Sequence, residues 1–242
     1  MTPHDAPLDA PAHDLDETLT YAIAPRPKRM FHTVLDAHDL LPSGRDYRAT
    51  VHTRVSTVDG ARAVTLRTEQ QLAQGTMREE LTCALHRSGG LRAKAMVRTF
   101  TSAAGEELRR ESADFSPGAL PMPPDLYPET CLPFLLRFAP RDKQRRSVHA
   151  WISDRMVARV YFEVEGATTL TVPAGRFDVS LVRMYPDLND WVKMPRMLAE
   201  LSKPFLPKYH MAYEAKAPHR LVRFEGSYGP PGAPELVLEL LK

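Results

Sequence analysis

The feature that most constrains this chain is a strict alternation of side chains over residues 48–57. One set of alternate positions is small or apolar (Ala49, Val51, Thr53, Val55, Thr57), and the other is polar (Arg48, Thr50, His52, Arg54, Ser56). A period of two places these sets on opposite faces of an extended chain, which predicts a half-buried strand. Asp59-Gly60 follows, and both positions of a two-residue hairpin turn need positive φ. We therefore expect an antiparallel meander to begin here.

Similar patterns continue along the chain. Further strands are predicted around Ala61–Thr68, Leu81–Leu85, Leu91–Val97, Val148–Ile152, Arg155–Glu165, Thr168–Val172, Phe177–Leu181, Tyr209–Ala215, Arg220–Tyr228 and Leu236–Leu241. Two short helices are predicted, within Pro128–Phe138 and within residues 194–203. Many short strands in succession favour a mainly β fold, a single antiparallel curled sheet or incomplete barrel, to which the one or two short helices are added.

Some of these predictions concern single residues. In the strand from Leu91, we expect Leu91, Ala93, Ala95 and Val97 on the buried face and Arg92, Lys94 and Arg98 on the other. Glu165-Gly166 is expected to turn the chain between two strands. Cys83 and Cys131 are too far apart for a C-x-x-C pair, so we expect reduced thiols, with Cys83 in the core and Cys131 at the start of the first helix.

Composition bounds the domain organisation and the partners. The first 28 residues mix Pro, Asp and Ala with few large apolar groups, which predicts a disordered tail over 1–28 and a single β-rich domain over 29–242. The net charge of +2 gives no field that would favour nucleic acid or an anionic membrane. No apolar run is long enough to span a bilayer, and residues 1–20 do not look like a signal peptide, so a cytoplasmic location is expected by default.

One turn suggests a family. The run Val172-Pro173-Ala174-Gly175-Arg176-Phe177-Asp178 resembles the "VPAG-x-F" hairpin of the DUF3108-like proteins. A Pro-rich crossing into Leu132–Phe138 and a closing stretch over Tyr213–Phe224 support the resemblance. It implies an open, strongly curved sheet that wraps around a helix, similar to lipoprotein-carrier folds. The family's function is undefined, and many of its members look exported. The turn should fix a register in which Leu170, Val172, Phe177, Val179 and Leu181 share the buried face.

Catalytic and cofactor motifs are absent from the sequence: it contains no G-x-G-x-x-G, G-x-x-x-x-G-K, G-x-S-x-G or H-E-x-x-H. The densest metal-like group is His32 and His38 with Asp36 and Asp39, but no third histidine is near. A zinc or iron site needs imidazoles and a carboxylate that converge on one point. We therefore favour a solvated surface for these residues. We predict neither a metal nor a cofactor.

Two polar groups have alternative interpretations. His219 lies between Glu214 and Glu225, where a carboxylate could tune a general base, although a salt-bridged sheet surface is the favoured interpretation. The charged run Arg141–Arg146 could bind phosphate groups, but such runs are usually solvated loops. It has no interleaved aromatics for base stacking, so nucleic-acid binding is not predicted.

Small interior residues point to a ligand. Ala49, Ala93, Ala95 and Ala158 would leave space inside a curled sheet, and apolar ligands bind in such cavities. The aromatic residues proposed to line the site are Trp151, Tyr161, Trp191, Phe205 and Tyr213. Alternatively, the helices simply fill the space. The leading hypothesis is a soluble module that binds an apolar or amphiphilic small molecule on the concave face. The alternatives are a cyclase- or isomerase-type enzyme that works by positioning and a scaffold without a ligand.

Overall fold

The computed structural model describes residues 8–9, 11, 13–26, 41, 46–58, 61–85, 90–116, 123–154, 156–187, 208–227 and 235–242. The predicted helix over 194–203, the metal-like group of His32, Asp36, His38 and Asp39, and the aromatic residues Trp191 and Phe205 lie outside these described residues.

The described residues form one sheet of thirteen strands. Its first six strands are β1 (Leu15–Pro25), β2 (Tyr47–Val58), β3 (Ala61–Leu72), β4 (Gly75–Leu85), β5 (Leu91–Ser102) and β6 (Glu107–Asp114). The others are β7 (Leu126–Pro128), β8 (Arg146–Ser153), β9 (Met156–Val172), β10 (Gly175–Pro186), β11 (Tyr209–Glu214), β12 (Leu221–Ser227) and β13 (Glu235–Leu240). Their order is β6-β5-β4-β3-β2-β1-β13-β12-β11-β10-β9-β8-β7.

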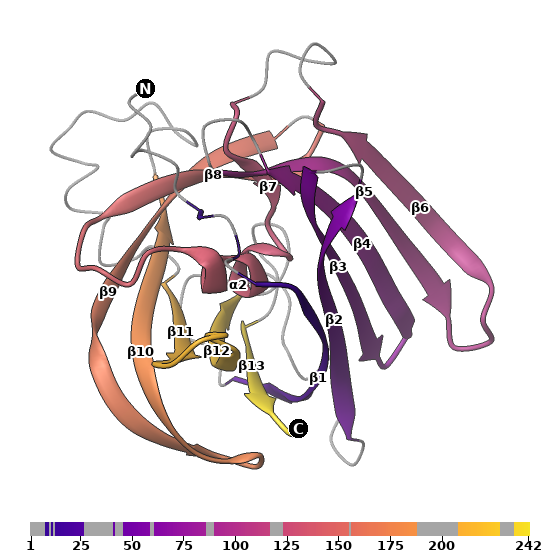
Figure 1. Ribbon diagram of the computed structural model, residues 1–242. Coiled ribbons are helices and arrows are strands. Elements are labelled where there is room, and N and C mark those ends of the chain that lie inside the picture. The colour runs from indigo at the N-terminus through magenta and orange to yellow at the C-terminus, as the bar shows by residue number, and fades with distance from the viewer. Residues whose placement is uncertain are drawn as a thin grey trace, which may run out of the picture.

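The sheet is curled but is not closed into a barrel, because β6 and β7 stand at the two ends of the strand order. Neighbouring strands pair antiparallel except β7 and β8, which are parallel. Figure 1 shows the strands wrapped around a short helical segment, α2 (Leu132–Leu135) continued by the 3₁₀ turn η1 (Leu136–Phe138). The predicted fold class, a mainly β curled sheet with a short helix against its concave face, is confirmed.

The helical segment fills the middle of the concave face. Leu132, Leu135 and Leu136 are fully buried, and Phe134 packs against Tyr21 of β1 with ring centroids 5.9 Å apart. Cys131 lies at the N-terminal end of α2, and Cys83 is buried on β4 beside Leu81, as predicted. In this part of the sheet, side chains therefore occupy the space that small interior residues were expected to leave open.

The prediction of a disordered tail over residues 1–28 is wrong for residues 15–25. They form β1, which pairs with β2 on one side and with β13 on the other. Leu19, Tyr21 and Ile23 alternate toward the core and are buried. A short period-two pattern is thus sufficient to order this segment, because the neighbouring strands satisfy its backbone on both sides.

The predicted faces of β5 are only half right, because a β-bulge interrupts its pairing with β4. Thr82 pairs with Ala95 and Cys83 pairs with Ala93, which leaves Lys94 as an extra residue. An extra residue shifts the alternation by one position. Leu91 and Ala93 are buried as expected, but from that point Met96 and Arg98 turn inward while Ala95 is exposed and Val97 is half-buried.

A second bulge changes β9. Leu181 pairs with Gly166 and Val182 pairs with Val164, so Glu165 is the extra residue and the strand runs on through Gly166. The predicted turn at Glu165-Gly166 is therefore wrong. The next turn is confirmed, since Val172 pairs with Gly175 across Pro173-Ala174.

The predicted inward register of this hairpin also holds, with graded burial. Val172 and Val179 are buried, while Leu170, Phe177 and Leu181 are half-buried and pack against the core. The aromatic ring of Phe177 is therefore a peripheral contact of the core.

Candidate functional site

The two ends of the curled sheet approach each other without a backbone ladder in the described pairings. Side chains bridge them instead. The hydroxyl of Tyr127 on β7 donates to the carbonyl of Leu91 on β5. Next to this contact lies a buried polar group that we name the Arg98 cluster, made of Glu79, Arg98, Glu129, Thr130 and Trp151. Its members come from β4, β5, the connection between β7 and α2, and β8.

The guanidinium of Arg98 is the centre of the cluster. Its Nη2 donates to Thr130 Oγ1 at 2.8 Å and to Glu79 Oε1 at 3.2 Å, and it lies 3.5 Å from Glu129 Oε1. Its Nη1 donates to Glu111 Oε2 at 3.4 Å. The Arg98 side chain is only 6% exposed and the Glu79 side chain is 0% exposed. Such charges are tolerated in an interior only when they are paired and hydrogen-bonded.

Thr130 and Trp151 complete the surroundings of Arg98. The Thr130 hydroxyl donates to Glu79 Oε2, so it relays the contact between the guanidinium and the carboxylate. The guanidinium carbon of Arg98 lies 5.9 Å from the centroid of the Trp151 ring, within the range of a cation–π contact. Phe115 packs edge-on against the same ring, with centroids 5.9 Å apart.

Burial perturbs the ionisation of this cluster. It raises the pKa of Glu129 to about 7, with Arg98 opposing the shift and Glu79 adding to it. Burial also disfavours the charged form of Arg98, but Glu79 and Glu129 outweigh this effect and raise the pKa of Arg98 above its usual value. Glu129 therefore carries a proton for part of the time near neutral pH, as a general acid or base at such a site would.

Three buried polar atoms of the cluster have no hydrogen-bond partner in the part of the chain that the structure describes: Arg98 Nε, Glu129 Oε2 and Trp151 Nε1. Two of them are N–H donors, and the third is a carboxyl oxygen that can accept or, when protonated, donate. Buried polar atoms are nearly always paired in folded proteins, so three such atoms in one cluster require a physical explanation. A polar group of a bound molecule would supply their partners.

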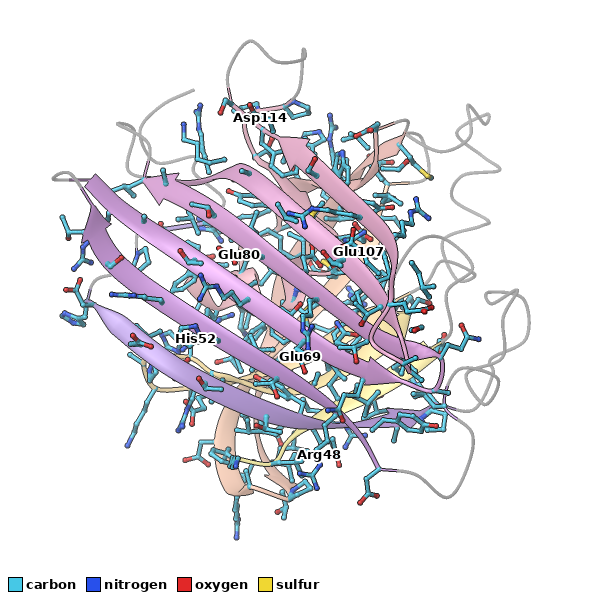
Figure 2. The ribbon with its side chains drawn as sticks, turned by 90° about the vertical axis from the view of Figure 1, so that its right-hand side faces the viewer. Arg48, His52, Glu69, Glu80, Glu107 and Asp114 are labelled. Atoms are coloured by element: carbon cyan, nitrogen blue, oxygen red, sulfur yellow. The ribbon has the colours of Figure 1, made fainter. Side chains whose placement is uncertain are left out.

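A second candidate lies on the outer face of strands β2–β5. It is an open groove of about 560 Å³, with a lining that includes Thr50, His52, Arg67, Glu69, Arg78, Glu80, Thr82, Ala95, Val97, Thr99 and Arg110. Figure 2 views this face, with His52, Glu69 and Glu80 pointing outward. Its charges pair with one another across strands, Arg67 with Glu80 at 2.9 Å and Arg78 with Glu69 at 2.7 Å. Exposed pairs of this kind form a self-neutralised, solvated surface.

The aromatic residues predicted to line a ligand site separate into two groups. Trp151 and Tyr213 are buried in the core cluster, at 3% and 0% exposure. Tyr161 alternates with the buried Val160 and Phe162 and so points to the opposite face, where Arg145 stacks on its ring. The structure therefore places it on the face opposite to the core, because the period of β9 sends it outward.

His219 does not form the carboxylate–imidazole pair that its neighbours suggested. Its Nδ1 lies 2.9 Å from the backbone carbonyl oxygen of Glu214. The Glu214 carboxylate is engaged by Arg220, at 2.8 Å to Nε and 2.6 Å to Nη2. Glu225 pairs with Arg26 and Arg223. The favoured interpretation, a salt-bridged sheet surface, matches this arrangement.

The sequence contains a signal for part of the Arg98 cluster. Glu79 falls between Met77 and Leu81 on the buried face of β4, so an acidic residue there breaks an apolar pattern. Thr68 and Gln70 break the pattern in the same way on β3, and both are buried. Arg98 was missed because the bulge at Lys94 reverses its face.

Within the described residues, no group of three or more His, Cys, Asp or Glu side chains is arranged to hold a metal ion. None of the helices in the described part of the chain has the length and apolar character needed to cross a membrane.

Comparisons with known proteins identify solved structures but no family. No family model and no curated protein matches the chain, so the resemblance to the DUF3108-like proteins stays a prediction. One similar structure is a "putative lipoprotein" from Parabacteroides distasonis, at 11% identity and a TM-score of 0.36, covering 99% of each chain. Another is a "putative exported protein with YmcC-like fold" from Bacteroides fragilis, at 11% identity and a TM-score of 0.38, covering 98% of this chain and 99% of the other.

Proposed function

We propose that this protein binds an amphiphilic small molecule on the concave face of its sheet, with the polar end of the ligand at the Arg98 cluster. The observation that carries the proposal is the set of unpartnered buried atoms Arg98 Nε, Glu129 Oε2 and Trp151 Nε1. A purely structural network gains most when all of its members are satisfied. A hydrogen-bonding head group would satisfy these three atoms, and the rest of the molecule would pack on apolar side chains of the concave face outside the part that α2 and η1 fill.

A direct test is native mass spectrometry of the purified full-length protein, followed by denaturation to release and identify any retained molecule. We expect an adduct of a few hundred daltons, on the order of what a binding cavity holds. Glu129→Gln should weaken its retention, because an amide cannot present the same pair of oxygens. Arg67→Met removes an exposed cation of the outer face and should leave retention unchanged.

A soluble probe gives an independent measurement. Anilinonaphthalene sulfonate should bind with a blue-shifted emission, and dodecanoate should displace it from the wild type more readily than from Glu129→Gln. If neither an adduct nor dodecanoate-sensitive probe binding is found, the proposal is wrong and the Arg98 cluster only holds the ends of the sheet together.

A second candidate function, an enzyme of the isomerase or cyclase kind, is favoured by one observation. The pKa of Glu129 near 7 suits proton transfer at neutral pH. Arg98 would then stabilise developing negative charge while the concave face holds the substrate in a reactive conformation. A retained molecule that is converted to an isomer of the same mass by the wild type, but not by Glu129→Gln, would select this function over simple binding.

A further inference from the structure

Arg141 is a partly buried arginine that has no acidic partner among the described residues. It follows η1 in the connection to β8, and its guanidinium carbon lies 4.4 Å from the centroid of the Tyr213 ring. Tyr213 is fully buried, and its hydroxyl donates to the carbonyl of Pro133 at 2.5 Å. The aromatic ring is thus a fixed platform that sets the plane of the guanidinium above it.

Two nitrogens of Arg141, Nε and Nη2, are shielded from solvent and have no hydrogen-bond partner within the described ranges. The acidic residue next to it in the sequence, Asp142, is committed to Arg146, whose Nη2 lies 2.7 Å from Asp142 Oδ2. Burial and the nearby charge of Arg137 lower the pKa of Arg141, with Tyr213 opposing them. An arginine nevertheless stays protonated in proteins, so Arg141 keeps a positive charge for which the described residues supply no counter-ion.

Arg220 shows how the Nε and Nη2 donors of an arginine bind a carboxylate. The Nε and Nη2 hydrogens of Arg220 point in parallel at the two carboxylate oxygens of Glu214, at 2.8 and 2.6 Å. This fork is the geometry in which a guanidinium binds a carboxylate or a phosphate group. Arg141 has the corresponding pair of donors, and neither donates a hydrogen bond to a described residue.

The surroundings leave the charge of Arg141 uncompensated. Arg137 forms an ion pair with Glu17 and donates from Nε and Nη2 to the carbonyl of Pro218. Arg220 has Glu214 as its partner. Arg137, whose charge acts on Arg141, and Arg220 each have a carboxylate partner, whereas Arg141 has none among the described residues.

We propose that Arg141, stacked on Tyr213, is the binding site for an oxyanion, a carboxylate or phosphate group of a small molecule. Its Nε and Nη2 hydrogens bind two oxygens of the anion, and the charge of the anion offsets the guanidinium. The site shares no residue with the Arg98 cluster, so anion binding at Arg141 does not depend on the function proposed above.

The test measures thermal unfolding of the full-length protein in increasing inorganic phosphate, or in acetate, against chloride at matched ionic strength. A ligand that binds only the native state raises the unfolding temperature, because it adds RT ln(1 + L/Kd), with L the free ligand concentration, to the free energy of unfolding. We expect a dose-dependent rise in the wild type and in Arg67→Met, whose exposed arginine already has a carboxylate partner. A larger response to phosphate identifies a phosphate-bearing ligand, and a larger response to acetate identifies a carboxylate.

Two variants at the site make the result specific. Arg141→Met should lower the anion affinity about tenfold or more, since it removes both donors and the charge. Arg141→Lys keeps a charge without the parallel fork, so it should fall between the wild type and Arg141→Met. The proposal is overturned if neither anion exceeds chloride in the wild type, or if both variants respond as the wild type does.

Discussion

Nη2 of Arg98 on β5 lies 3.5 Å from Oε1 of Glu129, which precedes α2, across the gap where the two ends of the curled sheet face each other. At this distance the hydrogen bond between the two groups is weak, although their charges still attract. Glu79 and Thr130, at 3.2 and 2.8 Å from the same nitrogen, hold the guanidinium more firmly. The contact between the two ends of the sheet is therefore stabilised by the whole Arg98 cluster more than by any single ion pair.

The first prediction concerns the loss of the central cation. Arg98→Met should lower the free energy of unfolding by about 3–5 kcal/mol, because it leaves buried carboxylates without a counter-charge. Chemical denaturation measures this change. Arg67→Met is the matched control and should cost less than about 1 kcal/mol, since its pair with Glu80 is exposed. Equal losses in the two variants would contradict a special role for the buried cluster.

The second prediction concerns pH. Burial raises the pKa of Glu129 from 4.5 to about 7, so the folded protein takes up a proton there that the unfolded chain does not hold between these pH values. The contribution of Glu129 to stability is therefore full below pH 4.5, falls as the pH rises through this window and levels off above it. The difference between the two pKa values corresponds to roughly 3 kcal/mol.

Glu129→Gln removes this titration and serves as the reference. We expect the wild type to lose stability relative to Glu129→Gln between pH 4.5 and pH 8, measured by urea denaturation at several pH values. A constant difference between the two proteins over this range would show that Glu129 titrates as an ordinary exposed carboxyl does.

The third prediction compares three glycines. Gly75 and Gly175, each the first residue of a strand after a tight turn, have φ values of 149° and 132°. A Cβ at Gly75 would lie 1.8 Å from the carbonyl oxygen of Thr101, whereas one at Gly175 would meet only Phe177 at 4.0 Å. Gly75→Ala should cost about 3 kcal/mol or more through the clash with backbone. Gly175→Ala should cost about 1–3 kcal/mol through backbone strain.

Gly166 is the control for both, because a Cβ there meets nothing within 4 Å. Gly166→Ala should change stability by less than about 0.5 kcal/mol in the same thermal or chemical unfolding experiment. The order of the three losses is the informative result, and a larger loss at Gly166 than at Gly175 would refute it.

The fourth prediction concerns β1. A chain that starts after Pro25 should not fold stably, because β2 and β13 each lose a partner strand and the core loses Leu19, Tyr21 and Ile23. A chain that starts at Leu8 keeps β1 and should give the native circular dichroism spectrum. Native-like spectra and unfolding temperatures from both truncations would show that β1 is dispensable.

The sequence predicts the overall class of fold well, because alternation and turn residues are local properties. The hairpin at Val172–Gly175 and the faces of β2 follow from them directly. The bulges at Lys94 and Glu165 do not, since an extra residue in one strand is defined only against its partner. The candidate site was missed for the same reason, because the bulge at Lys94 brings Arg98 inward to meet Glu79.

The error at the N-terminus had a different cause. Averaged composition over residues 1–28 hides the short alternation of Leu19, Tyr21 and Ile23. Only pairing with the distant β13 shows that this segment is structural. Likewise, Tyr161 and Trp151 are both aromatic residues on neighbouring strands, and only the register of β8 and β9 decides which of them faces the core.

The pairing of Tyr21 with Leu240 affects how the chain folds while it is being synthesised. During synthesis β1 leaves the ribosome early, yet one of its two edges has no partner until β13 has been made. A meander of β2–β6 can form meanwhile from local contacts. Joining the two halves of the sheet through β1 and β13 needs pairing between residues about 200 positions apart and is expected to be slow. An unpaired strand edge in a growing chain is open to association with other chains. The growing chain is therefore exposed to such association until β13 has been made and pairs with β1.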